Sequence, residues 1–229
     1  MSIKQSKIAI PLLLHKMKEV QREWERAVKV GDLVEIWCDR IQDLDLKKLL
    51  EKKSCPVIIN CKGPKEKGIF KGSEKERVQI LIEAAQGGAD FVDIGWHTNK
   101  KLLIELLKNK GKAKIIISHH NFEKTPSLAT LEKLAQKISV AGADMIKIIT
   151  TAQKNEDNLI LFELNQRLAK KKKEFLVFAM GPRGKISRLI CPLLGTAWMF
   201  APLDTRSASA PGQVPVEHLR QFWQAVGVE

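Results

Sequence analysis

The sequence contains no tyrosine, no closely spaced cysteine pair and no apolar run long enough to cross a membrane. The apolar stretch near the N-terminus, Ile8 to Leu14, is much shorter than the ~20 residues of a membrane helix. Pro11 interrupts this stretch, and no small-residue cleavage site follows it, so we do not expect a signal peptide. The sequence therefore predicts a protein without a membrane partner.

The four cysteines show no C-x-x-C spacing, which argues against a bound metal; they are Cys38, Cys55, Cys61 and Cys191. Without a secretory signal, we expect reduced thiols in a cytoplasmic protein. No nucleic-acid-binding motif is present, although the formal net charge is +13. The densest basic run, Lys170 to Lys173, is expected to be an exposed helix end. The positive charge is therefore better suited to steering an anionic small molecule than to binding nucleic acid.

Short β-branched apolar runs recur along the whole chain at regular intervals. Most are continuous and do not alternate with polar residues, which is typical of parallel strands covered on both faces. The strands expected are Lys7–Leu12, Leu33–Cys38, Pro56–Cys61, Phe91–Gly95, Lys114–Ser118, Met145–Ile149, Phe175–Ala179 and Ala197–Ala201.

Amphipathic stretches of helical length lie between these strands, for example Glu74–Gln86, Ser127–Val140 and Asn155–Lys170. Strand followed by helix, eight times in 229 residues, predicts an α/β fold with a single (β/α)8 TIM barrel. An open doubly wound sheet is the alternative, but no glycine-rich dinucleotide loop follows the first strand. No linker or break in composition is visible, so we expect residues 1–229 to form one domain.

Two residues indicate the chemistry, because catalytic groups of a barrel lie at the C-terminal ends of its strands. We expect Lys147 to end one strand and His120 to end the strand before it. A lysine within an apolar strand is costly unless it is neutral or paired. A neutral lysine can condense with a ketone, and a histidine can move the proton that the resulting iminium makes acidic. His119 should face the opposite side of its strand.

Further motifs make the chain similar to the type I 3-dehydroquinate dehydratases. The resemblance covers nearly the whole chain, and its motifs are Ser118–Phe122 with Lys124-Thr125-Pro126, Gly142–Lys147, Met180-Gly181 with Gly184–Arg188, and Ser209–Gln213. It implies a barrel enzyme that removes water from 3-dehydroquinate, an anionic substrate, in the biosynthesis of aromatic amino acids. It also implies a homodimer and no metal or organic cofactor, because the lysine supplies the electron sink.

The resemblance implies a role for each of the three catalytic residues. Lys147 would form the imine with the C3 ketone. His120 would take the C2 proton and later protonate the departing C1 hydroxyl, and Glu66 would orient His120.

The resemblance also implies the residues that bind substrate. Arg188 would bind the carboxylate as a bidentate fork, and Glu35 would hold hydroxyl groups. Ser209 and Gln213 belong to a loop that would close over the ligand. Lys62, which stands where the third strand of the family usually ends in an arginine, would also bind substrate.

Three positions depart from the family pattern. Trp37 replaces an arginine in Glu-x-Arg-x-Asp, Lys62 replaces the arginine after the third strand, and Gly95 replaces the glutamate of Asp-x-Glu. Lysine lacks the planar fork of arginine, so this exchange is not conservative at a bidentate site. Two alternatives follow: a Schiff-base lyase of the same fold for another hydroxy-keto acid, or a relative without catalysis.

Overall fold

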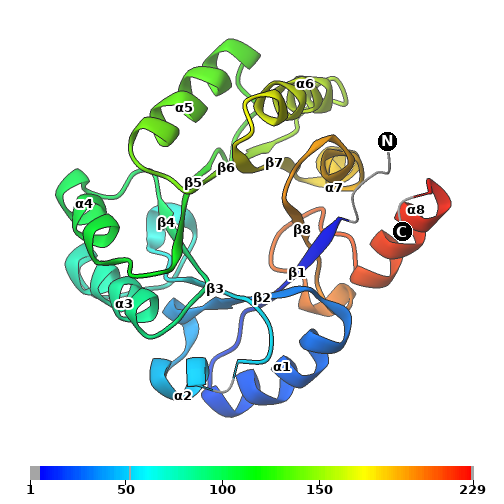
Figure 1. Cartoon of the computed structure of the whole chain (residues 1–229). Helices are drawn as coiled ribbons and strands as arrows, with labels where there is room; N and C mark the ends of the chain where they lie inside the picture. Colours follow the sequence, from blue (N-terminus) through cyan, green and yellow to red (C-terminus); the bar gives the residue numbers. More distant parts are fainter. Residues whose placement is uncertain (1–5, 52, 228–229) are drawn as a thin grey trace. The chain divides into compact units, whose positions relative to one another are not determined.

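Strands and helices alternate along the chain in the computed structural model, which describes residues 6–51 and 53–227. Within those residues there are eight strands and eight α-helices (Figure 1). The strands are β1 (Lys7–Leu12), β2 (Leu33–Trp37), β3 (Val57–Asn60), β4 (Phe91–Gly95), β5 (Lys114–His120), β6 (Met145–Thr151), β7 (Glu174–Met180) and β8 (Trp198–Phe200). The helices are α1 (Met17–Val30), α2 (Leu46–Glu51), α3 (Glu74–Gln86), α4 (Lys100–Asn109), α5 (Leu128–Val140), α6 (Asp157–Lys170), α7 (Lys185–Ile190) and α8 (Val216–Ala225).

All eight predicted strands are confirmed, with boundaries that differ by at most two residues. The largest differences are at β5 and β6, which continue to His120 and Thr151. Lys147 was expected to end its strand, and this was wrong: it is the third of the seven residues of β6.

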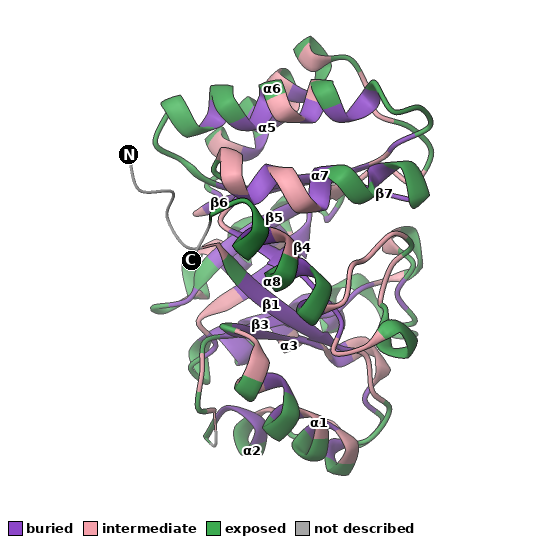
Figure 2. Ribbon diagram, turned by 90° about the vertical axis from the view of Figure 1, so that its right-hand side faces the viewer, coloured by how far each residue is buried: buried purple, intermediate pink, exposed green. Residues whose placement is uncertain are grey.

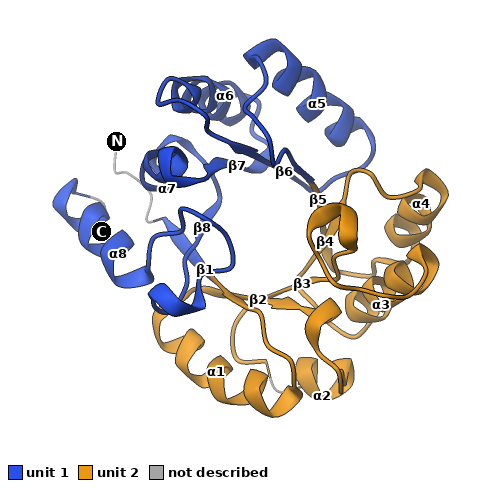
Figure 3. Ribbon diagram, turned by 180° about the vertical axis from the view of Figure 1, so that it is seen from behind, with its two compact units in different colours: residues 1–9, 119–229 blue, residues 10–118 orange. Residues whose placement is uncertain are grey.

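Two compact units divide the chain (Figure 3), and each has its own parallel sheet segments. In the unit of residues 10–118, β2 pairs with β3, β3 with β4, and β4 with β5. In the unit of residues 1–9 and 119–229, β6 pairs with β7, and Lys7 to Ala9 of β1 pair with β8. In both units the strands are parallel, as their continuous apolar sequences predict.

Helix boundaries follow from capping residues. Ser73 begins α3: its hydroxyl accepts from the Glu76 N–H, and the Glu76 carboxylate accepts from the Ser73 N–H, forming a capping box. Ser127 begins α5 in the predicted place by accepting from the Thr130 N–H. Gly142 follows α5 with φ +100°, a conformation that glycine adopts without steric cost.

Burial separates the strands from the outer faces of the helices (Figure 2). The strand interiors are almost wholly buried and supply most of the apolar core. The run Lys170 to Lys173 is exposed after α6, as predicted. The four cysteines are free thiols, and burial raises the pKa of Cys61 to about 12. In the part of the chain that the structure describes, no helix is long and apolar enough to span a membrane.

Candidate active site

Lys147 lies in the middle of β6 and is almost completely buried, with 5% of its surface exposed. Its Nζ lies 4.5 Å from the centroid of the Phe200 ring, which β8 provides. The face of an aromatic ring attracts an ammonium group at this distance, by up to ~2 kcal/mol where water is excluded. The lysine is therefore held in a fixed place inside the protein.

His120 ends β5 on the same face as Lys147. The Asn121 N–H donates to the Ile149 carbonyl at 2.8 Å, which places His120 level with Ile149 in the neighbouring strand. Because side chains alternate along a strand, Ile149 and Lys147 share one face, and His120 shares it with them. The imidazole stacks on the Phe122 ring, with centroids 5.8 Å apart and planes 10° apart. By the same alternation, His119 faces the other side.

Arg188 lies in the short helix α7 and has only 2% of its surface exposed. Its Cζ lies 4.8 Å from the centroid of the Phe178 ring on β7. Its Nε is buried without a hydrogen-bond partner, and no carboxylate pairs with the guanidinium among residues 6–51 and 53–227. Burial lowers the pKa of Arg188 to about 10. A buried cation without a counterion indicates a site for an anion.

Ser209 and Gln213 are joined to each other within one loop. The Gln213 Oε1 accepts from the Ser209 N–H at 2.7 Å, and the Gln213 Nε2 donates to the Ser209 Oγ at 2.9 Å. This loop meets the end of β7, where the Gly181 N–H donates to the Pro211 carbonyl at 3.1 Å. Gly212 has φ +82°, and a Cβ there would lie 2.3 Å from the Gly181 carbonyl oxygen. Only glycine therefore allows this close approach.

Lys62 is the centre of a buried polar cluster in the other unit. Its Nζ lies 2.6 Å from Asp93 Oδ1, 2.9 Å from Glu66 Oε1 and 3.0 Å from Ser118 Oγ. The Ser118 hydroxyl donates to Asp93 Oδ1 at 2.6 Å. Burial disfavours the charged form of Lys62, but the charges of Asp93 and Glu66 outweigh it and raise its pKa. The cluster therefore contains a charged lysine with two carboxylates.

Glu35 and Trp37 are also joined. The Trp37 indole N–H donates to Glu35 Oε2 at 2.9 Å, and Glu35 is buried in β2. The guanidinium carbon of Arg40 lies 5.9 Å from the centroid of the Trp37 ring. Trp37, which stands where an arginine is expected, thus still donates a hydrogen bond to this carboxylate.

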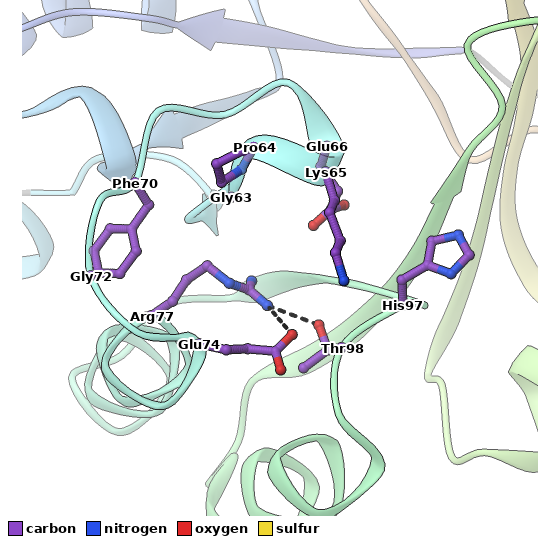
Figure 4. Close-up of a pocket in the computed structure, with 10 residues that line it drawn as sticks. All are labelled: Gly63, Pro64, Lys65, Glu66, Phe70, Gly72, Glu74, Arg77, His97 and Thr98. Carbon is purple, nitrogen blue, oxygen red and sulfur yellow. Dashed lines mark hydrogen bonds and ion pairs between the residues drawn. The ribbon is translucent and has the colours of Figure 1, made fainter.

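A cavity of about 250 Å³ borders Glu66 and the turn that carries it (Figure 4). Arg77 lies across this cavity and is buried, donating to the Cys61 carbonyl at 3.1 Å and to Thr98 Oγ1 at 2.9 Å. Glu74 lies 3.6 Å from the same guanidinium. Arg77 thus joins the ends of β3 and β4 and supports the turn of Glu66.

The sequence did not reveal which side chains contact the predicted site residues. Phe178 and Phe200 were assigned only to apolar strands, although they contact Arg188 and Lys147. Asp93 had a usable signal, because an aspartate within a buried apolar strand needs a partner. In the described part of the chain, no three His, Cys, Asp or Glu residues are grouped as metal ligands.

Comparison with known proteins identifies the family. The sequence model of the family 'Type I 3-dehydroquinase' matches residues 8–229. The chain belongs to this family. A 3-dehydroquinate dehydratase of Methanococcus maripaludis strain C7 is 32% identical over 222 residues, covering 96% of this chain and 100% of the relative. The bifunctional 3-dehydroquinate dehydratase/shikimate dehydrogenase of Arabidopsis thaliana is 33% identical over 224 residues, and the match spans 95% of this chain but 37% of that protein.

Solved structures of type I 3-dehydroquinases confirm the fold. The enzyme of Clostridium difficile, solved with covalently modified comenic acid, has a TM-score of 0.88 at 23% identity and covers 97% of this chain and 92% of its own. The enzyme of Geobacillus kaustophilus also has a TM-score of 0.88 at 23% identity, covering 99% and 96%. The chain therefore has the (β/α)8 barrel fold that its sequence predicts.

Proposed function

We propose that this type I 3-dehydroquinase dehydrates 3-dehydroquinate to 3-dehydroshikimate through an imine on Lys147. Its family makes it a carbon–oxygen lyase of aromatic biosynthesis. The roles of the individual residues are our proposal. The observation that supports them most is the place of Lys147, buried on the same face as His120 of the adjacent strand.

The proposed reaction begins when the Lys147 amine attacks the C3 ketone and water leaves, which gives an iminium. The iminium accepts electron density, so His120 can remove the proton from C2. The C1 hydroxyl then leaves as water with a proton from His120, in a syn elimination. Hydrolysis of the imine releases the product and restores Lys147. Proton transfer of this kind typically contributes ~10²–10⁴-fold to the rate.

Arg188 would supply the charge that holds the substrate carboxylate. It is buried against Phe178 without a carboxylate partner in the described chain, so a bound anion would remove the cost of its isolation. A guanidinium can donate two parallel hydrogen bonds to a carboxylate. The loop that contains Ser209 and Gln213 contacts the end of β7 through the hydrogen bond from the Gly181 N–H to the Pro211 carbonyl. Both residues would bind the same ligand.

Replacing Arg188 with leucine is expected to lower kcat/KM for 3-dehydroquinate by about 10–100-fold, mainly through KM, because a hydrogen bond to a charged group contributes ~1.5–3 kcal/mol. Steady-state kinetics that follow the ultraviolet absorbance of the conjugated product measure this. Lys185→Met removes an exposed positive charge from the same helix and is the control. Equal effects of the two variants would show that Arg188 acts only through overall charge.

Trp37→Phe is expected to raise KM by about 3–10-fold, because it removes the indole donor of the buried Glu35 carboxylate, a loss of ~1 kcal/mol. Glu35, which is proposed to hold the substrate hydroxyls, would then lose the donor that fixes its Oε2. The KM of the purified variant is the measurement. An unchanged KM would mean that Trp37 does not position Glu35.

Three further properties belong to the proposal. We expect residues 1–229 to act as one domain, which the family match over residues 8–229 supports. We expect a homodimer from the family resemblance, and a cytoplasmic location because the cysteines are free thiols. The chloroplastic Arabidopsis relative shows that location differs among related proteins.

Turnover of 3-dehydroquinate tests the proposed activity itself. The purified chain should produce 3-dehydroshikimate, seen as the appearance of a conjugated double bond. If it forms the imine but releases no product, the chain is either a Schiff-base lyase for a different hydroxy-keto acid or a relative without catalysis. If it does neither, the proposal fails.

A further inference from the structure

We infer that Lys62 and Gly95 together position Glu66, and that Lys62 does not bind the substrate. The inference rests on the proposed function, in which Glu66 orients His120. The sequence departs from the family pattern at both positions, with lysine for arginine at 62 and glycine for glutamate at 95. The structure gives one physical reason for both.

The ammonium of Lys62 has no donor left for a ligand. It carries three N–H groups, and three acceptors already surround it: Asp93 at 2.6 Å, Glu66 at 2.9 Å and Ser118 at 3.0 Å. Lys62 is 2% exposed, and Asp93 and Ser118 are fully or nearly fully buried. A substrate oxygen could bind Lys62 only by displacing one of these groups. An arginine, with five N–H groups, would have donors to spare.

Gly95 leaves the space that the Glu66 carboxylate occupies. A Cβ at position 95 would lie 2.4 Å from Glu66 Oε2, 2.6 Å from its Cδ and 2.7 Å from its Oε1. Heavy atoms do not approach this closely, so a side chain at position 95 would displace the Glu66 carboxylate from its present place. Gly95 is not among the residues with positive φ, which means that space and not backbone conformation requires the glycine.

Charge gives the same result as space. Lys62 pairs with two carboxylates, Asp93 and Glu66. A glutamate at position 95 would add a third carboxylate in this buried region, where like charges repel strongly. Lysine at 62 and glycine at 95 are thus compatible with each other, and together they fix the Glu66 carboxylate on Lys62.

The test is Gly95→Ala. The colliding atoms are the end of a flexible side chain, so the protein should fold while Glu66 is pushed away from Lys62. We expect kcat to fall by about 10–100-fold with KM nearly unchanged, because misplacement by about 1 Å can cost ~10²-fold. Gly63→Ala is the matched control in the adjacent turn, since its Cβ would meet only Arg77 atoms at 3.8 Å and beyond. It should retain the activity of the parent.

A double-mutant cycle with Glu66→Ala shows whether the effect passes through Glu66. In the Glu66→Ala background, Gly95→Ala should cause no further loss. The inference is overturned if Gly95→Ala has parental kcat, if the two losses multiply, or if the loss appears in KM. If Glu66→Ala itself leaves kcat unchanged, the proposed role of Glu66 is wrong and this inference is wrong with it. Thermal unfolding of each variant confirms that the folded protein is being compared.

Discussion

Lys147→Ala is expected to abolish dehydration, with a loss in kcat of at least ~10³-fold. The variant lacks the amine that forms the iminium, and without the iminium the C2 proton is not acidic enough to remove. Steady-state assays at high enzyme concentration measure the residual rate. The fold should survive, because alanine fits an extended strand and adds no strain to β6.

Lys147→Arg is the matched control for charge. It places a guanidinium near the Phe200 ring, whose centroid lies 4.5 Å from the Lys147 Nζ. A guanidinium does not form the imine. We therefore expect this variant to be as inactive as Lys147→Ala. Substantial activity in Lys147→Arg would mean that the charge at this position, and not covalent chemistry, accelerates the reaction.

His120→Ala is expected to lower kcat by about 10²–10⁴-fold while leaving imine formation possible. The histidine is proposed to move the C2 proton, a step that follows the attack of Lys147 on the ketone. Reduction of the variant with borohydride in the presence of 3-dehydroquinate should therefore trap a covalent adduct, which intact-protein mass spectrometry detects.

His119→Ala provides the comparison for this result. The two histidines are adjacent in β5 but face opposite sides, and only His120 shares a face with Lys147. His119→Ala should keep most of the activity. If both variants lose the same activity, the loss reports damage to β5 and not proton transfer.

The strands could be predicted from the sequence because parallel strands of a barrel are buried on both faces. Runs made mostly of apolar residues, such as Val57–Asn60 and Phe91–Gly95, are visible without any structure. The ends of β5 and β6 were less visible, because their last residues are polar: His119 and His120 in one, Thr150 and Thr151 in the other. The predicted strands therefore stopped two residues short, at Ser118 and Ile149.

The contacts around the predicted residues could not be predicted in the same way. Lys62 follows β3, Asp93 lies within β4 and Ser118 within β5, and the sequence alone does not say which of their atoms face one another. The lysine at 62 was therefore interpreted as a weakened substrate contact. We infer another role from the distances of its Nζ to Asp93, Glu66 and Ser118, namely that Lys62 positions Glu66.

The departures from the family pattern also have a clearer physical meaning. Trp37 was expected to lose the polar function of the arginine that it replaces. Its indole N–H nevertheless donates to Glu35 at 2.9 Å, so the carboxylate keeps one donor. Gly95, which lacks the expected carboxylate, provides the space for Glu66. These substitutions are consistent with a rearranged binding region around an unchanged Lys147 and His120.

Trapping the imine tests the central claim most directly. The purified chain is incubated with 3-dehydroquinate and sodium borohydride, and the protein is then digested and mapped by mass spectrometry. We expect one covalent adduct, on Lys147, that does not form when substrate is omitted. No adduct, or an adduct on a different lysine, would contradict it.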